Sequence, residues 1–124
     1  MSRRVVITGM GIVSPIGNTV SDFFESLKSA KLGFSPFKGV VDENFEVKLV
    51  GSVNDFDPER RIDKKEAKRM DRFTQFAVTA ALDAIEDSGS KFEDIDPFRA
   101  GVICGVGIGG LDLTGGEYNK YSEK

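Results

Sequence analysis

Two nearly continuous apolar runs constrain the fold of this chain more than any other feature of its sequence. They lie in residues 3–13 and 99–106, and their apolar members are Val5, Val6, Ile7, Met10, Ile12 and Val13, then Ala100, Val102, Ile103, Cys104 and Val106. A strand with one solvated face alternates between apolar and polar residues, whereas a continuous run indicates a strand covered on both faces. We therefore predict a buried strand at each position.

Helical patterns separate these two runs. Ser14-Pro15-Ile16-Gly17 interrupts the first run, and Asn18 is the expected N-cap of a helix that continues to about Ala30. The strongest pattern covers residues 71–88, where apolar side chains recur at i, i+3 and i+4, and Gly89 is the expected stop. Weaker patterns predict a half-exposed strand over residues 45–53, a turn or short helix over 56–62 and a charged helical turn over 63–70. Residues 111–124 are polar and predict no closing element.

The resulting order, β-α-β-α-β, is typical of a single α/β domain, which is what 124 residues allow. No stretch approaches the roughly 20 apolar residues that cross a bilayer, so no membrane partner is expected. The net charge of −3 does not indicate a nucleic-acid binder. A single cysteine cannot form an internal disulfide, which fits a reducing compartment and a cytoplasmic protein.

The chain contains no histidine, so it has no imidazole for acid–base chemistry or for metal binding. With a single cysteine as well, we expect no ordinary zinc site. Cys104 is the one available thiol, but the sequence offers no histidine base to activate it. Because it lies within an apolar run, we predict a buried cysteine that packs as a small hydrophobe.

Two glycine-rich segments follow or interrupt the apolar runs. Gly9 and Gly11 could belong to a dinucleotide-binding turn, but Ser14 and Pro15 stand where that motif continues into a helix. Residues 105–110 lack the Gly-Lys-Ser/Thr ending of a phosphate-binding loop. We therefore favour glycines that allow close packing, with a nucleotide-binding α/β domain as the alternative.

Residues 59–72 have a net charge of +3, from seven basic and four acidic residues, whereas the whole chain has a net charge of −3. On one continuous helix, five of the basic side chains would share an arc of roughly 140°. They are Lys64, Lys65, Lys68, Arg69 and Arg72. Such a face can attract an acidic partner, or it can simply be a solvated surface.

Several segments together resemble one enzyme family, in its order and spacing. They are Arg4-Val5-Val6-Ile7-Thr8-Gly9-Met10-Gly11, Ser14-Pro15-Ile16-Gly17-Asn18, Lys68-Arg69-Met70-Asp71-Arg72-Phe73, the helix from Gln75 to Gly89, and Gly107-Ile108-Gly109-Gly110-Leu111. The family is that of the β-ketoacyl-[acyl-carrier-protein] synthases, and the likeness is to its elongating type II. The resemblance implies a thiolase-like fold of two similar halves in a layered αβαβα sandwich. It also implies a cytoplasmic homodimer that condenses malonyl- and acyl-carrier protein, with loss of CO₂, in fatty-acid elongation.

The same resemblance implies a limited role for residues 1–124. The nucleophilic cysteine of the family lies in a Thr-Ala-Cys type motif that this sequence does not contain, and Cys104 does not match it. We therefore expect no catalytic residue here, and an N-terminal portion of the first thiolase-like half of a longer chain. Lys65, Lys68 and Arg69 match the helix that docks the acidic carrier protein, and Ile108 matches a residue that lines the acyl pocket. The alternative is a non-catalytic module that binds acidic carrier proteins.

Overall fold

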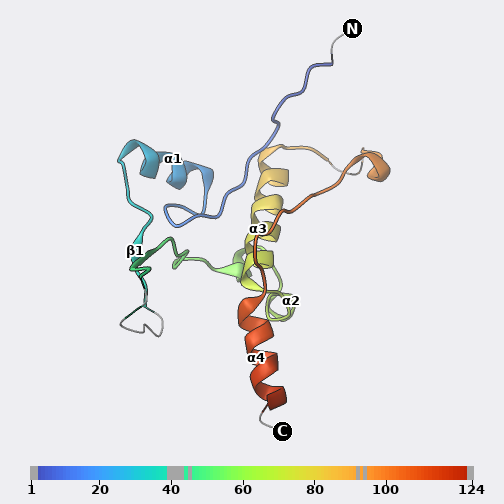
Figure 1. Cartoon of the computed structure of the whole chain (residues 1–124). Coiled ribbons are helices and arrows are strands. Elements are labelled where there is room, and N and C mark those ends of the chain that lie inside the picture. Colours follow the sequence, from blue (N-terminus) through green and yellow to red (C-terminus); the bar gives the residue numbers. More distant parts are fainter. Residues whose placement is uncertain (1–2, 39–43, 45, 92, 94, 123–124) are drawn as a thin grey trace. The chain divides into compact units, whose positions relative to one another are not determined.

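The computed structural model describes residues 3–38, 44, 46–91, 93 and 95–122. Figure 1 shows its elements, which follow in the order α1 (Val20–Lys28), β1 (Ser35–Pro36), β2 (Leu49–Val50), η1 (Pro58–Arg60), α2 (Lys64–Ala67), α3 (Arg72–Asp87), η3 (Pro97–Arg99) and α4 (Leu111–Ser122). The chain forms two compact units. One comprises Ile12–Phe56, and the other comprises Met1–Gly11 together with Asp57–Lys124.

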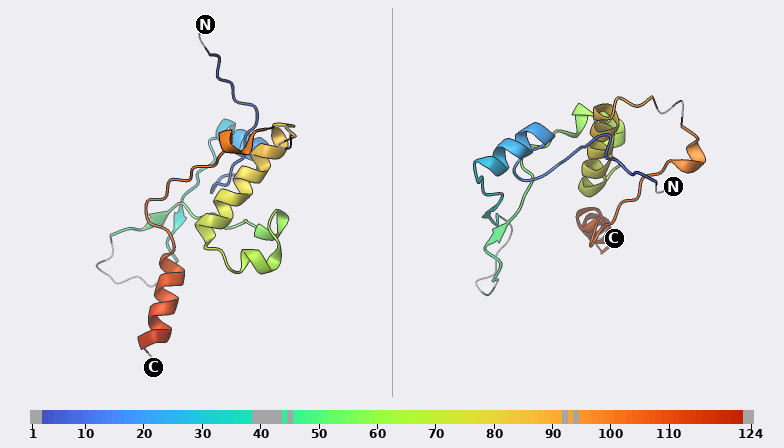
Figure 2. Two further views of the ribbon diagram at one scale, coloured as in Figure 1. Left: turned by 90° about the vertical axis from the view of Figure 1, so that its right-hand side faces the viewer. Right: turned by 90° about the horizontal axis from the view of Figure 1, so that it is seen from above.

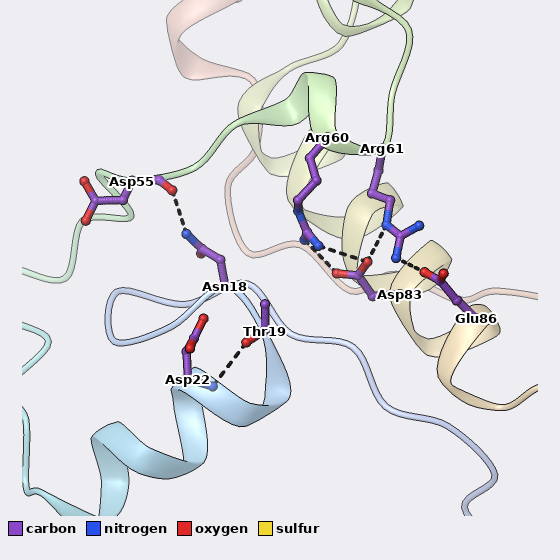
Figure 3. Close-up of polar contacts among 8 residues, drawn as sticks. All are labelled: Asn18, Thr19, Asp22, Asp55, Arg60, Arg61, Asp83 and Glu86. Atoms are coloured by element: carbon purple, nitrogen blue, oxygen red, sulfur yellow. Dashed lines mark hydrogen bonds and ion pairs between the residues drawn. The ribbon is translucent and has the colours of Figure 1, made fainter.

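In the first unit, α1 begins one residue later than predicted. Its N-cap is Thr19, whose hydroxyl accepts a hydrogen bond of 3.1 Å from the backbone N–H of Asp22. Asn18 instead donates its side-chain amide to the carbonyl of Asp55, at 2.8 Å (Figure 3). Both residue types suit an N-cap, so the contact with Asp55 distinguishes them. The helix ends just before Ala30, which has a left-handed φ of 53°.

A turn and a two-stranded sheet complete this unit. Ser26, buried on α1, donates its hydroxyl to the carbonyl of Ile16 at 2.6 Å and so ties the preceding turn to the helix. β1 and β2 pair in antiparallel fashion, with Ser35 opposite Val50 and Pro36 opposite Leu49. Of the strand predicted over residues 45–53, only Leu49–Val50 is observed, and residue 45 lies outside the described residues.

The second unit is organised by α3, whose position confirms the helix predicted over residues 71–88. Asp71 is its N-cap and Ser88 its C-cap. The predicted stop at Gly89 is also confirmed, because this residue has a φ of 61° that favours glycine. The short helical turns predicted around residues 56–70 are confirmed by η1 and α2.

Gly9 and Gly11 lie directly against the backbone of α3, which confirms that they serve packing. A Cβ atom on Gly9 would lie 2.6 Å from the backbone nitrogen of Ser88, and one on Gly11 would lie 2.8 Å from that of Ala84. Real Cβ atoms do not approach so closely, so only glycine fits at either position. Between them, the backbone N–H of Met10 donates to the carboxylate of Asp87 at 2.9 Å.

The predicted strands over residues 3–13 and 99–106 are not observed in the part of the chain that the structure describes. Neither segment pairs as a strand there, and Arg99 belongs to η3 instead. Val5 is 95% exposed and Ile103 is 100% exposed. A strand requires a neighbour for its backbone hydrogen bonds, and neither segment has one among the described residues. The predicted burial of Cys104 is wrong for the same reason, because its side chain is exposed.

Residues 111–122 give the opposite result, since α4 forms where no element was predicted. Gly115 and Gly116 interrupt its sequence, and its described side chains are exposed. A helix with weak propensity and no apolar stripe carries no periodic signal that a sequence pattern can detect.

Candidate functional site

Lys65 lies within α2, Lys68 is the C-cap of this helix and Arg69 follows it, and we call these three residues the basic turn. All three are exposed. The turn begins in a well-defined way, because the carboxylate of Asp63 accepts a hydrogen bond of 2.8 Å from the backbone N–H of Lys65. The basic turn ends in a tight bend, in which the backbone N–H of Arg69 donates to the carbonyl of Glu66 at 2.9 Å.

The predicted single helical face is wrong, because the basic residues do not share one helix. α2 ends at Ala67, and Arg72 begins a separate helix, α3. Gln75 of α3 stabilises this break, since its side-chain amide donates to the carbonyls of Ala67, at 2.8 Å, and Met70, at 3.3 Å. These are carbonyls that a continuing helix would have used. Ala67 is itself buried, which fixes the end of α2.

Two neighbouring arginines are held by carboxylates of α3. Arg60 donates both terminal nitrogens to Asp83, at 2.7 and 3.3 Å, and Arg61 donates its Nε to the same carboxylate at 2.6 Å (Figure 3). Arg61 also forms an ion pair with Glu86. The two arginines therefore tie η1 and its C-cap residue to α3, and their charges are neutralised locally.

The basic turn differs from these arginines in its electrostatics. Lys64, next to the turn, pairs with Glu59 at 3.5 Å. In contrast, Lys65, Lys68 and Arg69 form no ion pair with any residue that the structure describes. Three neighbouring, exposed positive charges that lie outside any described ion pair can attract and orient an acidic partner.

Ile108 lies in the loop formed by residues 107–110, which we call the Ile108 loop. Its side chain is 79% exposed. A pocket of ≈ 390 Å³ lies between this loop and the start of α3, and its wall includes Met70, Arg72, Phe73, Ile108, Leu111 and Leu113. The structure therefore brings Ile108 close to the segment that follows the basic turn, although the two are far apart in sequence.

Little else in the described residues indicates chemistry. The exposed thiol of Cys104 has no histidine to activate it, since the chain contains none. Within the described residues, no group of three histidine, cysteine, aspartate or glutamate side chains could hold a metal ion. In the same part of the chain, no helix has the length and apolar character that a membrane span requires.

The sequence analysis did not identify Asp83 and Glu86 as partners of the arginines. A signal was present, because these acids are three residues apart on α3 and Arg60 and Arg61 form a basic doublet. Residues three apart share one helix face, so the spacing makes a common partner possible. The partner itself depends on how η1 packs on α3, which no local pattern contains.

Comparisons with a family model, with curated proteins and with solved structures all indicate the same enzyme family. Residues 2–124 match the family model described as the beta-ketoacyl synthase, N-terminal domain. The chain is 39% identical to a 3-oxoacyl-[acyl-carrier-protein] synthase 2 of Vibrio harveyi over 98% of its length, and 44% identical to one of Staphylococcus aureus over 90% of its length. It spans only 29% and 27% of these two relatives. The solved structure of the ishigamide ketosynthase/chain length factor is similar over 74% of this chain and 23% of that protein, with a TM-score of 0.64 and 36% sequence identity. This similarity confirms the predicted α/β, thiolase-like fold class.

Proposed function

Because the chain belongs to the β-ketoacyl synthase family, we propose that it is the N-terminal portion of a type II β-ketoacyl-[acyl-carrier-protein] synthase. The complete enzyme would condense malonyl-carrier protein with acyl-carrier protein, with loss of CO₂, in fatty-acid elongation. Two relatives that bear the synthase 2 name support this proposal through their identity over nearly the whole chain. Residues 1–124 would then form part of the first thiolase-like half.

In this proposal the described residues supply scaffold and recognition, and the reacting groups lie elsewhere in the complete enzyme. The absence of histidine from the sequence supports this division, because the family relies on two imidazoles. Nor does the single thiol, Cys104, lie in the nucleophile motif of the family. The complete enzyme would be a cytoplasmic homodimer without metal or organic cofactor.

The basic turn would dock the acidic carrier protein, and Ile108 would line the acyl pocket. One observation carries the docking proposal: the turn keeps three exposed charges without ion-pair partners among the described residues, while Arg60 and Arg61 beside it are neutralised. Charges that are already paired contribute little to a new partner, whereas uncompensated ones steer and orient it. The three side chains of the basic turn are therefore the charges of this segment best placed to meet an acidic partner.

A charge-reversal experiment tests this role in the full-length enzyme. Lys65, Lys68 and Arg69 are replaced together by glutamate, and the dissociation constant for acyl-carrier protein is measured at several salt concentrations. Each exposed pair contributes about 0.5 kcal/mol, and reversal adds repulsion, so we expect affinity to fall by about tenfold or more. The salt dependence of the remaining binding should also decrease.

A matched control separates docking from net charge. The triple variant Lys31→Glu, Lys91→Glu and Arg99→Glu changes the charge equally at exposed positions outside the basic turn. It should leave the affinity within about twofold, because these three residues are not part of the proposed docking surface. Equal losses in both variants, or none in either, would show that the basic turn is an ordinary solvated surface. Carrier binding by the isolated 124-residue chain, without condensation in the full-length protein, would favour the non-catalytic module instead.

A further inference from the structure

The Ile108 loop touches the beginning of α3 through two glycines. A Cβ atom on Gly109 would lie 2.7 Å from Cε1 of Phe73, so the loop backbone rests directly against the aromatic ring. A Cβ atom on Gly110 would lie 2.9 Å from Oδ2 of Asp71, and Gly110 has a φ of 75°. The left-handed backbone favours glycine at position 110, and a Cβ atom at position 109 would force the Phe73 ring or the loop to shift.

Asp71 lies where the Ile108 loop meets the beginning of α3. It is the N-cap of α3, yet its side chain makes no capping hydrogen bond there. Its carboxylate lies instead beside Gly110, which precedes α4 and accepts the first helical hydrogen bond, of 2.9 Å, from Thr114. Figures 1 and 2 show α4, in red, starting beside the first turn of α3. A negative charge is favourable at the start of a helix, so the position of this carboxylate suits the first turn of α4.

These contacts determine where Ile108 can lie. The residue immediately precedes Gly109, and the same pocket is walled by the Phe73 ring and by residues of α4. A shift of the ring or of the α4 start would therefore carry Ile108 with it. We propose that Asp71 and Phe73 are positioning residues that hold the Ile108 loop and thereby set the acyl-chain length that the pocket accepts.

The inference rests on the proposed function and adds a physical link within it. Residues 68–73 would carry part of the docking surface at one end and the support of the acyl pocket at the other. Gln75 holds the middle of this segment through its hydrogen bond to the Met70 carbonyl. The segment thereby fixes the distance between the place where the carrier docks and the place where its acyl chain is measured.

The test uses full-length enzyme with hexanoyl- and myristoyl-carrier protein, and compares the ratio of the two kcat/KM values. Gly109→Ala places a methyl group against the Phe73 ring, so the ring or the loop must move. Because one methylene in an apolar pocket changes discrimination by about tenfold or more, we expect the ratio to change by about that factor. Partial unfolding would lower both rates equally and leave the ratio unchanged.

A double-mutant comparison identifies Phe73 as the cause. Phe73→Leu removes the ring atoms that the new methyl group meets, so it should restore much of the ratio lost in Gly109→Ala. The control is Gly107→Ala, in the same loop, where an added Cβ would meet no atom within 4 Å in this structure. Its effect on the ratio should be the same whether residue 73 is Phe or Leu.

The possible outcomes are distinct. A changed ratio in Gly109→Ala, rescued by Phe73→Leu, supports the proposal. If Gly109→Ala does not fold, Phe73→Leu alone must change the ratio, and an unchanged ratio overturns the proposal. An altered ratio that Phe73→Leu does not rescue overturns it as well. If the unmodified enzyme condenses neither substrate, the proposed function fails, which is a different result from normal condensation with an insensitive ratio.

Discussion

Replacement of Asp83 by alanine should release η1 and α2 from α3. This carboxylate accepts three hydrogen bonds from two guanidinium groups, which are those of Arg60 and Arg61. Its side chain is 13% exposed, and those of the two arginines are 35% and 30% exposed. Alanine would take this shared carboxylate away from two partly buried, neighbouring positive charges, while Arg61 would keep its ion pair with Glu86.

The size of the effect follows from this partial burial. Loss of one partner from a fully buried ion pair costs about 3–5 kcal/mol, whereas a fully exposed pair contributes about 0.2–1 kcal/mol. The arginines lie between these limits, so we expect a loss of about 2 kcal/mol in the free energy that opens η1 and α2. Since 1.4 kcal/mol corresponds to a factor of ten, backbone amides there should exchange about 30-fold faster.

Hydrogen–deuterium exchange of the full-length protein, followed by mass spectrometry of peptides from residues 57–70, measures this opening. Glu117→Ala is the matched control, because Glu117 pairs with Lys120 where both side chains are about 70% exposed. That variant should change exchange in its own helix by no more than about twofold. An acceleration below about threefold in Asp83→Ala would refute the argument that this network holds the basic turn in place.

Two further substitutions test packing around α3, and both are measured by urea unfolding of the full-length protein. Gly11→Ala should lower the free energy of unfolding by about 3 kcal/mol, because its Cβ would collide with the α3 backbone. The control is Gly101→Ala, whose Cβ meets no atom within 4 Å and which should change this free energy by less than about 1 kcal/mol. Similar values for the two variants would contradict the close approach of Gly11 to α3. Thr79→Val should raise the free energy of unfolding by about 1 kcal/mol, because the Thr79 hydroxyl is fully buried and has no hydrogen-bond partner among the described residues. Thr79→Ser, which keeps the hydroxyl but loses the methyl group, should lower the free energy of unfolding. A loss of stability in Thr79→Val would reveal a partner for that hydroxyl.

Local features of the fold could be predicted from the sequence. The helix over residues 71–88 could be predicted because its signals, apolar periodicity and a terminal glycine, are local properties of the sequence. The same holds for the short turns around residues 56–70. The predicted N-cap of α1 is wrong by one residue because asparagine is the more favourable N-cap type, whereas the side chain of Asn18 bonds the distant carbonyl of Asp55 and Thr19 caps the helix.

Features that depend on distant partners could not be predicted in the same way. An apolar run shows that a segment could pair as a strand, but not that a neighbour is present, and residues 3–13 remain unpaired in the described structure. The ion pairs of Asp83 and the contact of Gly109 with Phe73 also join residues that only the tertiary structure brings together. The roles of the basic turn and of Ile108 remain predictions that binding and selectivity measurements must test.

The contact of Gly9 and Gly11 with α3 also restricts how the N-terminal segment can move. A slide of one residue along the helix would place Met10 where no Cβ atom fits, and would break the hydrogen bond from its N–H to Asp87. Contact with α3 thus fixes the register of this segment along the helix. The alternation of small and large residues decides which side chains of this segment turn toward α3 and which remain available to a neighbouring strand.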